Sequence, residues 1–157
     1  MGFGFLVVRR TGADRRLTTL DWPHPVEQPL GPHLAAWLDR QGWLAAHQAD
    51  DALAAATVTL AADVVQEQVG SPGAEDPEAV VLRQQVGLRR AFASDTATAA
   101  LVGACDGRLT VGTLVAAVRQ VLGDDGGGDG IDGAEEGRDL LAQVRVLVEA
   151  GVLTPSV

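Results

Sequence analysis

The side chains best suited to recognising a ligand fall into two groups in this sequence. A proline-rich stretch, HPVEQPLGP over 24–32, holds His24, Glu27 and Gln28 in a loop that its prolines stiffen. Because such a loop presents polar groups at a low entropic cost, we predict a binding edge for a substrate or a partner there. The alternative is that the prolines only guide the chain from a strand into the helix that follows.

Three arginines make up the second group. Arg83, Arg89 and Arg90 fall within a β-rich stretch, where their guanidinium groups are candidates to contact an anionic substrate. The alternative is that they are ordinary solvated strand arginines, paired with the acidic residues that gather between positions 21 and 78. The sequence leaves both interpretations open.

The usual signatures of catalysis and of cofactor or metal binding are missing. The only G-x-G, in GFGF at 2–5, lies inside a strand-like run without a helix after it, which is the wrong context for a dinucleotide loop. His24, His33 and His47 are too scattered to form a helical metal-binding pair, and the sequence contains no G-x-S-x-G elbow. We therefore predict no catalytic residue, no cofactor-binding residue and no metal site in this chain alone.

Composition limits the possible functions further. A chain of 157 residues with 46% hydrophobic residues is long enough to bury a core. Its net charge of −9 disfavours nucleic acid as a partner. Cys105 is the single cysteine, for which we expect a buried place at a helix end. Because there is no secretory signal and no apolar run that could span a bilayer, we expect a cytoplasmic protein without a membrane partner.

The first half of the chain predicts a partial, mostly antiparallel sheet with one amphipathic helix. The apolar run 2–10 is typical of a buried strand. Apolar residues at helical spacing predict a helix over 32–46. Two more strands, 55–69 and 79–92, are predicted to form a hairpin around the turn GSPGAEDP, with Gly87 as a candidate bulge. The alanines of 55–69 also allow a helix there.

From residue 94 onward the pattern changes to three helices, each with one apolar stripe. Asp95 and Thr110 stand where they can cap the first two helices, and Gly151 closes the third. The Gly- and Asp-rich segment 123–134 lacks the spacing of a calcium loop and is predicted to be a mobile connection.

The fold class predicted from these elements is α+β. Residues 1–93 are expected to form the partial sheet with its helix. Residues 94–157 are expected to form a separate small domain of three helices, similar to a winged helix. The domain boundary is placed at the change of pattern near residue 94.

Four stretches follow one another along the chain in a familiar order. They are GFGFLVVRRTGADR, HPVEQPLGPHLAAWLDRQ, EDPEAVVLRQQVGLRR and LVGACDGRLTVGTLVAAV. In this order they resemble the C-terminal part of a family of actinobacterial class I S-adenosylmethionine-dependent methyltransferases. The resemblance implies that 1–93 holds the last strands and the hairpin of a Rossmann-like core, and that 94–157 is a winged-helix-like C-terminal domain.

In that family the glycine-rich cofactor loop and the Asn-Pro-Pro-aromatic catalytic motif lie upstream, and neither occurs in these 157 residues. The resemblance therefore implies a C-terminal fragment or remnant that gives substrate-side or structural support. S-adenosylmethionine would be bound only in a complete enzyme, or in one complemented by a separate core. Members of the family resemble enzymes that methylate protein glutamine or RNA guanine, so the resemblance leaves the methyl acceptor open.

Two other functions stay open at this point. A stand-alone interaction module would use the unpaired edge of the predicted hairpin to bind a partner or a second copy of the chain. A winged-helix DNA-binding protein is the weaker alternative, because the third predicted helix has more acidic residues than arginines. These residues are Arg138 and Arg145 against Glu135, Glu136, Asp139 and Glu149.

Overall fold

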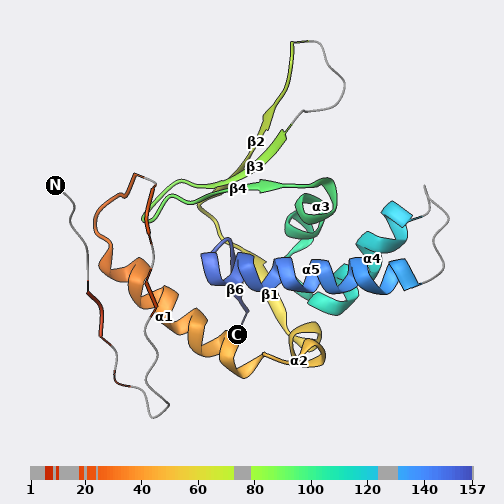
Figure 1. Cartoon of the computed structure of the whole chain (residues 1–157), viewed down its shortest axis with the longest axis horizontal. Coiled ribbons are helices and arrows are strands. Elements are labelled where there is room, and N and C mark those ends of the chain that lie inside the picture. The colour runs from red at the N-terminus through yellow and green to blue at the C-terminus, as the bar shows by residue number, and fades with distance from the viewer. Residues whose placement is uncertain are drawn as a thin grey trace.

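A computed structural model shows the arrangement of five helices and six strands within the part of the chain that it describes (Figure 1). The described residues are 6–8, 10, 18–19, 21–23, 25–72, 79–123 and 131–156, with side chains described outside 122–123 and 131–138. The architecture mixes helices with two small antiparallel sheets, which confirms the predicted α+β class.

The first sheet joins strands that are far apart in the sequence. Its order is β5-β1-β6, and both neighbours run antiparallel to the central strand β1. Val58 of β1 lies opposite Pro155, and Thr57 lies opposite Thr110. The three strands are β1 (Thr57–Leu60), β5 (Asp106–Thr110) and β6 (Leu153–Pro155).

The core lies where four helices pack against this sheet. The helices are α2 (Asp50–Ala55), α3 (Thr96–Ala104), α4 (Val111–Gly123) and α5 (Ile131–Ala150). One hydrophobic cluster runs through all of them, and its fully buried side chains include Leu53, Val58, Leu101, Val148 and Leu153. Burial of each such side chain stabilises the fold by roughly 1.5–3 kcal/mol before the entropic costs are counted.

The second sheet is built around a hairpin that extends away from the helices (Figure 1). Its order is β2-β3-β4, and the antiparallel β2–β3 pairing runs from Val64 opposite Gln84 to Val69 opposite Ala79. This register confirms the predicted hairpin. The strands are β2 (Val64–Val69), β3 (Ala79–Gln84) and β4 (Ala91–Ser94).

The predicted strands of this hairpin are wrong in their limits. The segment 55–69 is two strands that lie in different sheets, because a turn at residues 62–63 separates β1 from β2. The segment 79–92 is also broken, since Gly87 has a φ of +64° and lies in a turn between β3 and β4. Gly87 is therefore a turn residue and does not form a bulge.

Helix α1 (Gly31–Ala46) confirms the helix predicted over 32–46. Pro32 occupies its first turn, where the missing N–H costs no hydrogen bond. The residue after the helix, His47, is its C-cap, and its ring stacks on Trp43 with 4.0 Å between the ring centroids. None of its residues is fully buried, so α1 lies on the outside of the core.

The local signals for the last three helices are confirmed. An Asp95 oxygen accepts the Thr98 N–H at 2.7 Å, the Thr110 hydroxyl accepts the Thr113 N–H at 3.3 Å, and Gly151 ends α5 with a φ of +85°. The short strands β5 and β6 were not predicted. The predicted loop 123–134 extends too far, because α5 already begins at Ile131. Residues 124–130 of this loop lie outside the described residues.

The predicted domain boundary falls between β4 and α3. The first sheet crosses it, since β1 pairs with two strands from the other side. The core cluster likewise contains Leu82 of β3 beside residues of α3, α4 and α5. The division into two domains stays a prediction, and contacts across the boundary are extensive.

The N-terminal run 2–10 does not form the predicted buried strand in its described part. Leu6, Val7 and Val8 have no regular secondary structure and are 86%, 46% and 84% exposed. Residues 1–5 and 9 lie outside the described residues. Among the helices that are described, none combines the length and the apolar character needed to cross a membrane.

Candidate functional site

The turn between β3 and β4, residues 85–90, lies against the proline-rich loop and the start of α1. The Glu27 N–H donates to the Gly87 carbonyl at 2.8 Å. The His33 ring packs where a side chain at Gly87 would stand, because a Cβ there would come within 2.4 Å of the ring. Glycine is thus required at this position by both backbone conformation and space.

Gln84 ties this turn to the end of α5. Its side chain is buried, and its Nε2 donates to the carbonyl oxygens of Ala150 and Gly151 at 3.3 and 3.2 Å. Its Oε1 accepts the Arg90 N–H at 3.3 Å. The buried amide therefore has partners for both its nitrogen and its oxygen, as buried polar groups generally do.

Arg90 is half-buried beside Trp22, with its guanidinium carbon 4.6 Å from the centroid of the Trp22 ring. This is the geometry of a cation–π contact. Burial lowers the pKa of Arg90, and the nearby Glu149 carboxylate acts in the opposite direction.

Arg40 comes from α1 and lies against the end of α5. A Cβ on Gly151 would come within 2.8 Å of the Arg40 guanidinium, which fills the place that a side chain would take. Burial lowers the pKa of Arg40, and the positive charge of Arg90 lowers it further, while Asp39 and Asp63 raise it. The buried Arg40 Nε has no hydrogen-bond acceptor in the described part of the chain.

These groups surround a pocket of about 130 Å³. It lies where α1, the β3–β4 turn and the end of α5 meet. The lining residues are His33, Arg40, Ala61, Asp63, Gln84, Leu88, Ala150, Gly151 and Thr154. The lining holds a guanidinium, an imidazole and a carboxylate, so the pocket can bind a small polar ligand.

The residues predicted as ligand contacts divide into two sets in the structure. Glu27, Arg89 and Arg90 are near this pocket, since Glu27 bonds to the turn that carries both arginines. The exposed Gln28 instead accepts the Leu30 N–H at 3.0 Å and so supports the start of α1. His24 lies outside the described residues.

Arg83 belongs to a different part of the molecule. Its Nε donates to Glu67 of β2 at 2.8 Å, which raises the pKa of Arg83 and lowers that of Glu67. The pair stands on the hairpin, with side chains 37% and 41% exposed. Arg83 therefore has the paired, partly solvated environment that was the alternative to an anion contact.

The central residues of the pocket, Arg40 and Gln84, were not predicted. A signal for Gln84 was present in the alternation of β3, because Leu82 and Gln84 share the buried face of that strand. No local signal marks Arg40, since its place depends on how α1 packs against α5.

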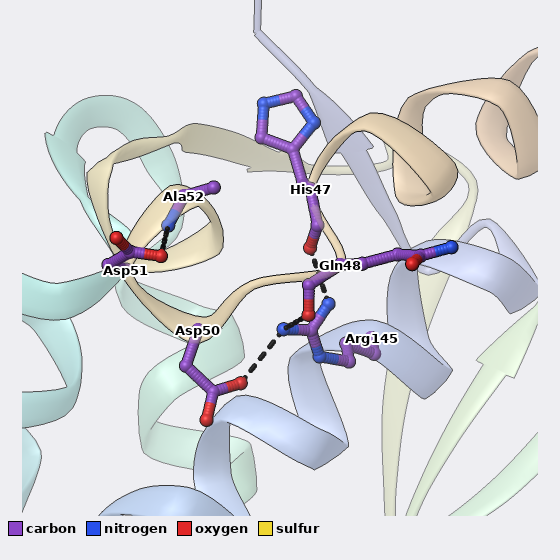
Figure 2. A network of polar contacts seen from close by, with 6 residues as sticks. All are labelled: His47, Gln48, Asp50, Asp51, Ala52 and Arg145. Carbon is purple, nitrogen blue, oxygen red and sulfur yellow. Dashed lines mark hydrogen bonds and ion pairs between the residues drawn. The ribbon is translucent and has the colours of Figure 1, made fainter.

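Figure 2 shows a second polar network, which links α1, α2 and α5. Arg145 of α5 donates to the carbonyl oxygens of His47 and Gln48 and to the Asp50 carboxylate, the last two at 2.8 and 2.9 Å. Its guanidinium thus holds the connection between α1 and α2 in place. Three N–H groups of Arg145 are engaged in this way.

Cys105 occupies the place expected of it. It is 4% exposed at the end of α3, and its thiol donates to the Leu101 carbonyl at 3.2 Å. Burial, with a smaller contribution from Asp106, raises the thiol pKa to about 11. Within the described part of the chain, no group of three or more His, Cys, Asp or Glu side chains could hold a metal ion.

Comparison with known proteins gives a family without an assigned activity. The search of curated proteins finds no match. Residues 35–155 match the family described as a domain of unknown function, DUF7782, and this range runs from the first half of α1 to the end of β6. It includes most of the pocket, with Arg40, Gln84 and Gly151, and leaves out His33. The chain belongs to the DUF7782 family.

Proposed function

We propose that this chain is the C-terminal, non-catalytic part of an S-adenosylmethionine-dependent methyltransferase, and that it acts in the cytoplasm. It gives substrate-side or structural support to a core that binds the methyl donor. The resemblance of four ordered stretches to such a family suggests the proposal, and the DUF7782 match is neutral toward it. One structural observation, the exposed apolar N-terminal segment, carries it further.

Leu6, Val7 and Val8 are the apolar residues of this segment that the structure describes. Leu6 is 86% and Val8 is 84% exposed, although Val and Leu in a β-rich run are typical of a strand inside a sheet. Burying such a side chain contributes roughly 1.5–3 kcal/mol. Addition of this segment to the sheet of a methyltransferase core would bury it, and the described body of the chain does not.

The described glycines with positive φ are each crowded by a neighbouring side chain. Gly87, Gly107 and Gly151 are the described glycines with positive φ, the conformation that a tight phosphate- or cofactor-binding turn uses. At each of them a neighbouring side chain stands where a Cβ would be, namely His33, Ser156 with Thr59, and Arg40. None therefore offers an open backbone surface to a cofactor. The sequence also has no asparagine, which the family's catalytic motif requires.

Association with a core tests the proposal. The DNA upstream of Met1 is read for a core with the glycine-rich loop and the Asn-Pro-Pro-aromatic motif, and the two polypeptides are co-expressed. We expect them to purify as an equimolar complex. A double variant, Leu6→Asp with Val8→Asp, should weaken the association by about tenfold or more because charge replaces the apolar contact.

Val121→Asp is the matched control, since Val121 is 72% exposed on α4, away from the N-terminal segment. It should leave the association unchanged. All three variant positions are exposed, so the thermal stability of the chain alone should change little. Absence of any such core, or equal retention of the double variant and the control, would contradict the proposal.

A stand-alone interaction module is the second candidate. Its supporting observation is the edge of the second sheet, where β2 pairs with β3 on one side and has no other strand neighbour among the described residues. Val65 and Val69 of β2 are 41% and 55% exposed. Such an edge can accept another strand.

This alternative predicts a folded monomer, or a homodimer through β2. Light scattering after size-exclusion chromatography gives the mass, and a Val65→Lys variant should dissociate a dimer formed through this edge. Circular dichroism that shows an unfolded chain, or scattering that shows aggregation, would exclude the alternative.

A further inference from the structure

The pocket between α1, the β3–β4 turn and the end of α5 has lining groups of two kinds. Gln84 and Thr154 already have hydrogen-bond partners within the protein. The side chains of His33, Arg40 and Asp63 make no hydrogen bond or ion pair with any described residue. A cation, an imidazole and a carboxylate thus line one small space without direct hydrogen bonds, although the charge of Asp63 acts on Arg40.

Arg40 is the most constrained of the three. Its guanidinium lies against the backbone of Gly151, and its buried Nε–H has no acceptor in the described chain. Arg90 is close enough for its charge to act on Arg40, and both arginines are half-buried. The Asp39, Asp63 and Glu149 carboxylates offset part of the repulsion between the two arginines. They do not give the buried Arg40 Nε–H an acceptor, and a bound oxyanion would supply one.

The Asp63 carboxylate restricts which anion fits. Asp63 and Arg40 both line the pocket and carry opposite charges, yet their side chains do not form an ion pair. An oxyanion that enters between them must accept from Arg40 and also tolerate a carboxylate. An oxyanion with an O–H group does both, because it donates to the carboxylate through that group.

We propose that this pocket, formed by Arg40, His33 and Asp63 beside Arg90, is a binding site for hydrogen phosphate, either as the free ion or as a phosphate group that keeps a proton. A pocket of about 130 Å³ is large enough for one phosphorus with its four oxygens. Sulfate has the same shape but no proton near neutral pH, so Asp63 repels it. The site is independent of the methyltransferase proposal.

Titration calorimetry of the full chain tests this site, with inorganic phosphate and sulfate as probes in chloride buffer of matched ionic strength. We expect phosphate to bind at least about tenfold more tightly than sulfate, since one charge-assisted hydrogen bond is gained and one repulsion avoided. A third titration with phosphoserine separates the two sources of phosphate. Tighter binding of phosphoserine than of phosphate assigns the site to a phosphorylated chain, and weaker binding assigns it to the free ion.

Two variants probe the roles of the lining residues. Arg40→Gln should weaken phosphate binding by about tenfold or more, because it removes a charged donor. Asp63→Asn should tighten sulfate binding and so reduce the preference for phosphate. Arg108→Gln is the control, since Arg108 is exposed on β5 and pairs with Asp106.

The outcomes separate clearly. Equal affinity of the unaltered protein for the two anions would overturn the proposal, as would no phosphate binding at millimolar concentration. An Arg108→Gln variant that loses as much affinity as Arg40→Gln would overturn it as well. If circular dichroism shows that Arg40→Gln does not fold, the Asp63→Asn variant tests the proposal alone. An unchanged preference of that variant for phosphate over sulfate would then overturn the proposal.

Discussion

The two sheets of this protein are held in place by different forces. The β5-β1-β6 sheet and its four helices supply almost all of the buried hydrophobic side chains, whereas the β2-β3-β4 sheet supplies only Leu82 to that group. The second sheet depends more on its own antiparallel register and on the buried amide of Gln84, which bonds to the end of α5. Extensive apolar packing therefore stabilises one region, whereas the other is attached to it by a smaller apolar contact, through Leu82, Val64 and Phe92, and by the Gln84 amide.

The largest expected effect is a core truncation in the first region. Leu153 of β6 is fully buried, so Leu153→Ala should lower the free energy of unfolding by about 2–5 kcal/mol. Val69→Ala in β2, where the side chain is 55% exposed, should stay within about 0.5 kcal/mol of the original protein. Urea denaturation followed by circular dichroism measures both, and similar losses in the two variants would refute the contrast.

Alkaline pH should act on the first region through Cys105. Its pKa is raised by burial from 9.0 to about 11, so the folded state favours the protonated thiol. The stabilisation is complete below pH 9 and is lost as the pH rises towards 11, by roughly 2–3 kcal/mol in total. Denaturation at a series of pH values should show this loss, and Cys105→Ala should remove that part of the pH dependence.

Loss of the polar connection between the two regions should cost somewhat less. Gln84→Ala leaves the Ala150 and Gly151 carbonyls without their side-chain donor, which should cost about 1–3 kcal/mol. Hydrogen exchange should then show faster opening of β3 and β4 than of β1. Gln68→Ala on the exposed part of β2 is the matched control and should change neither measurement.

Glycine substitutions should change stability in opposite directions at Gly151, directly after α5, and at Gly103, within α3. Gly151 has a φ of +85° and contacts the Arg40 guanidinium, so Gly151→Ala should destabilise by about 1 kcal/mol or more. Gly103 is exposed within α3 with open space around it, and Gly103→Ala should stabilise by about 0.5–1 kcal/mol. Stabilisation by both substitutions would show that neither the positive φ of Gly151 nor its contact with Arg40 requires glycine there.

The smallest effect is expected on the hairpin surface. Arg83 and Glu67 form a solvent-exposed pair, and such pairs contribute little to stability. Glu67→Gln should therefore leave the urea midpoint unchanged within error. Donation from Arg83 lowers the Glu67 pKa, so acid should break this pair only below the ordinary range of glutamate. A clear loss of stability in Glu67→Gln would mean that the hairpin is more tightly coupled to the core than its contacts indicate.

The sequence predicted those helices whose starts and ends are set by neighbouring residues in the chain. The apolar spacing and Pro32 gave α1, Asp95 and Thr110 gave the starts of α3 and α4, and Gly151 gave the end of α5. The strands β5 and β6 have only five and three residues, and they exist because they pair with β1 far away in the sequence. Periodicity cannot reveal strands this short.

The same distinction applies to the pocket. The sequence pointed to Glu27, Arg89 and Arg90, which lie in one turn and a nearby loop of the structure but do not line the pocket. It could not indicate Arg40, because that side chain reaches the pocket only through the packing of α1 against α5. Arg83 was grouped with the other arginines by its position in the chain, although the end of β3 separates it from them.

The claim that this chain supports a methyltransferase core without binding the donor itself has one direct test. Calorimetric titration of S-adenosylmethionine is carried out first into the purified chain and then into the chain in complex with its core. We expect no detectable heat of binding with the chain alone and saturable binding with the complex. Micromolar binding to the chain alone would contradict the account.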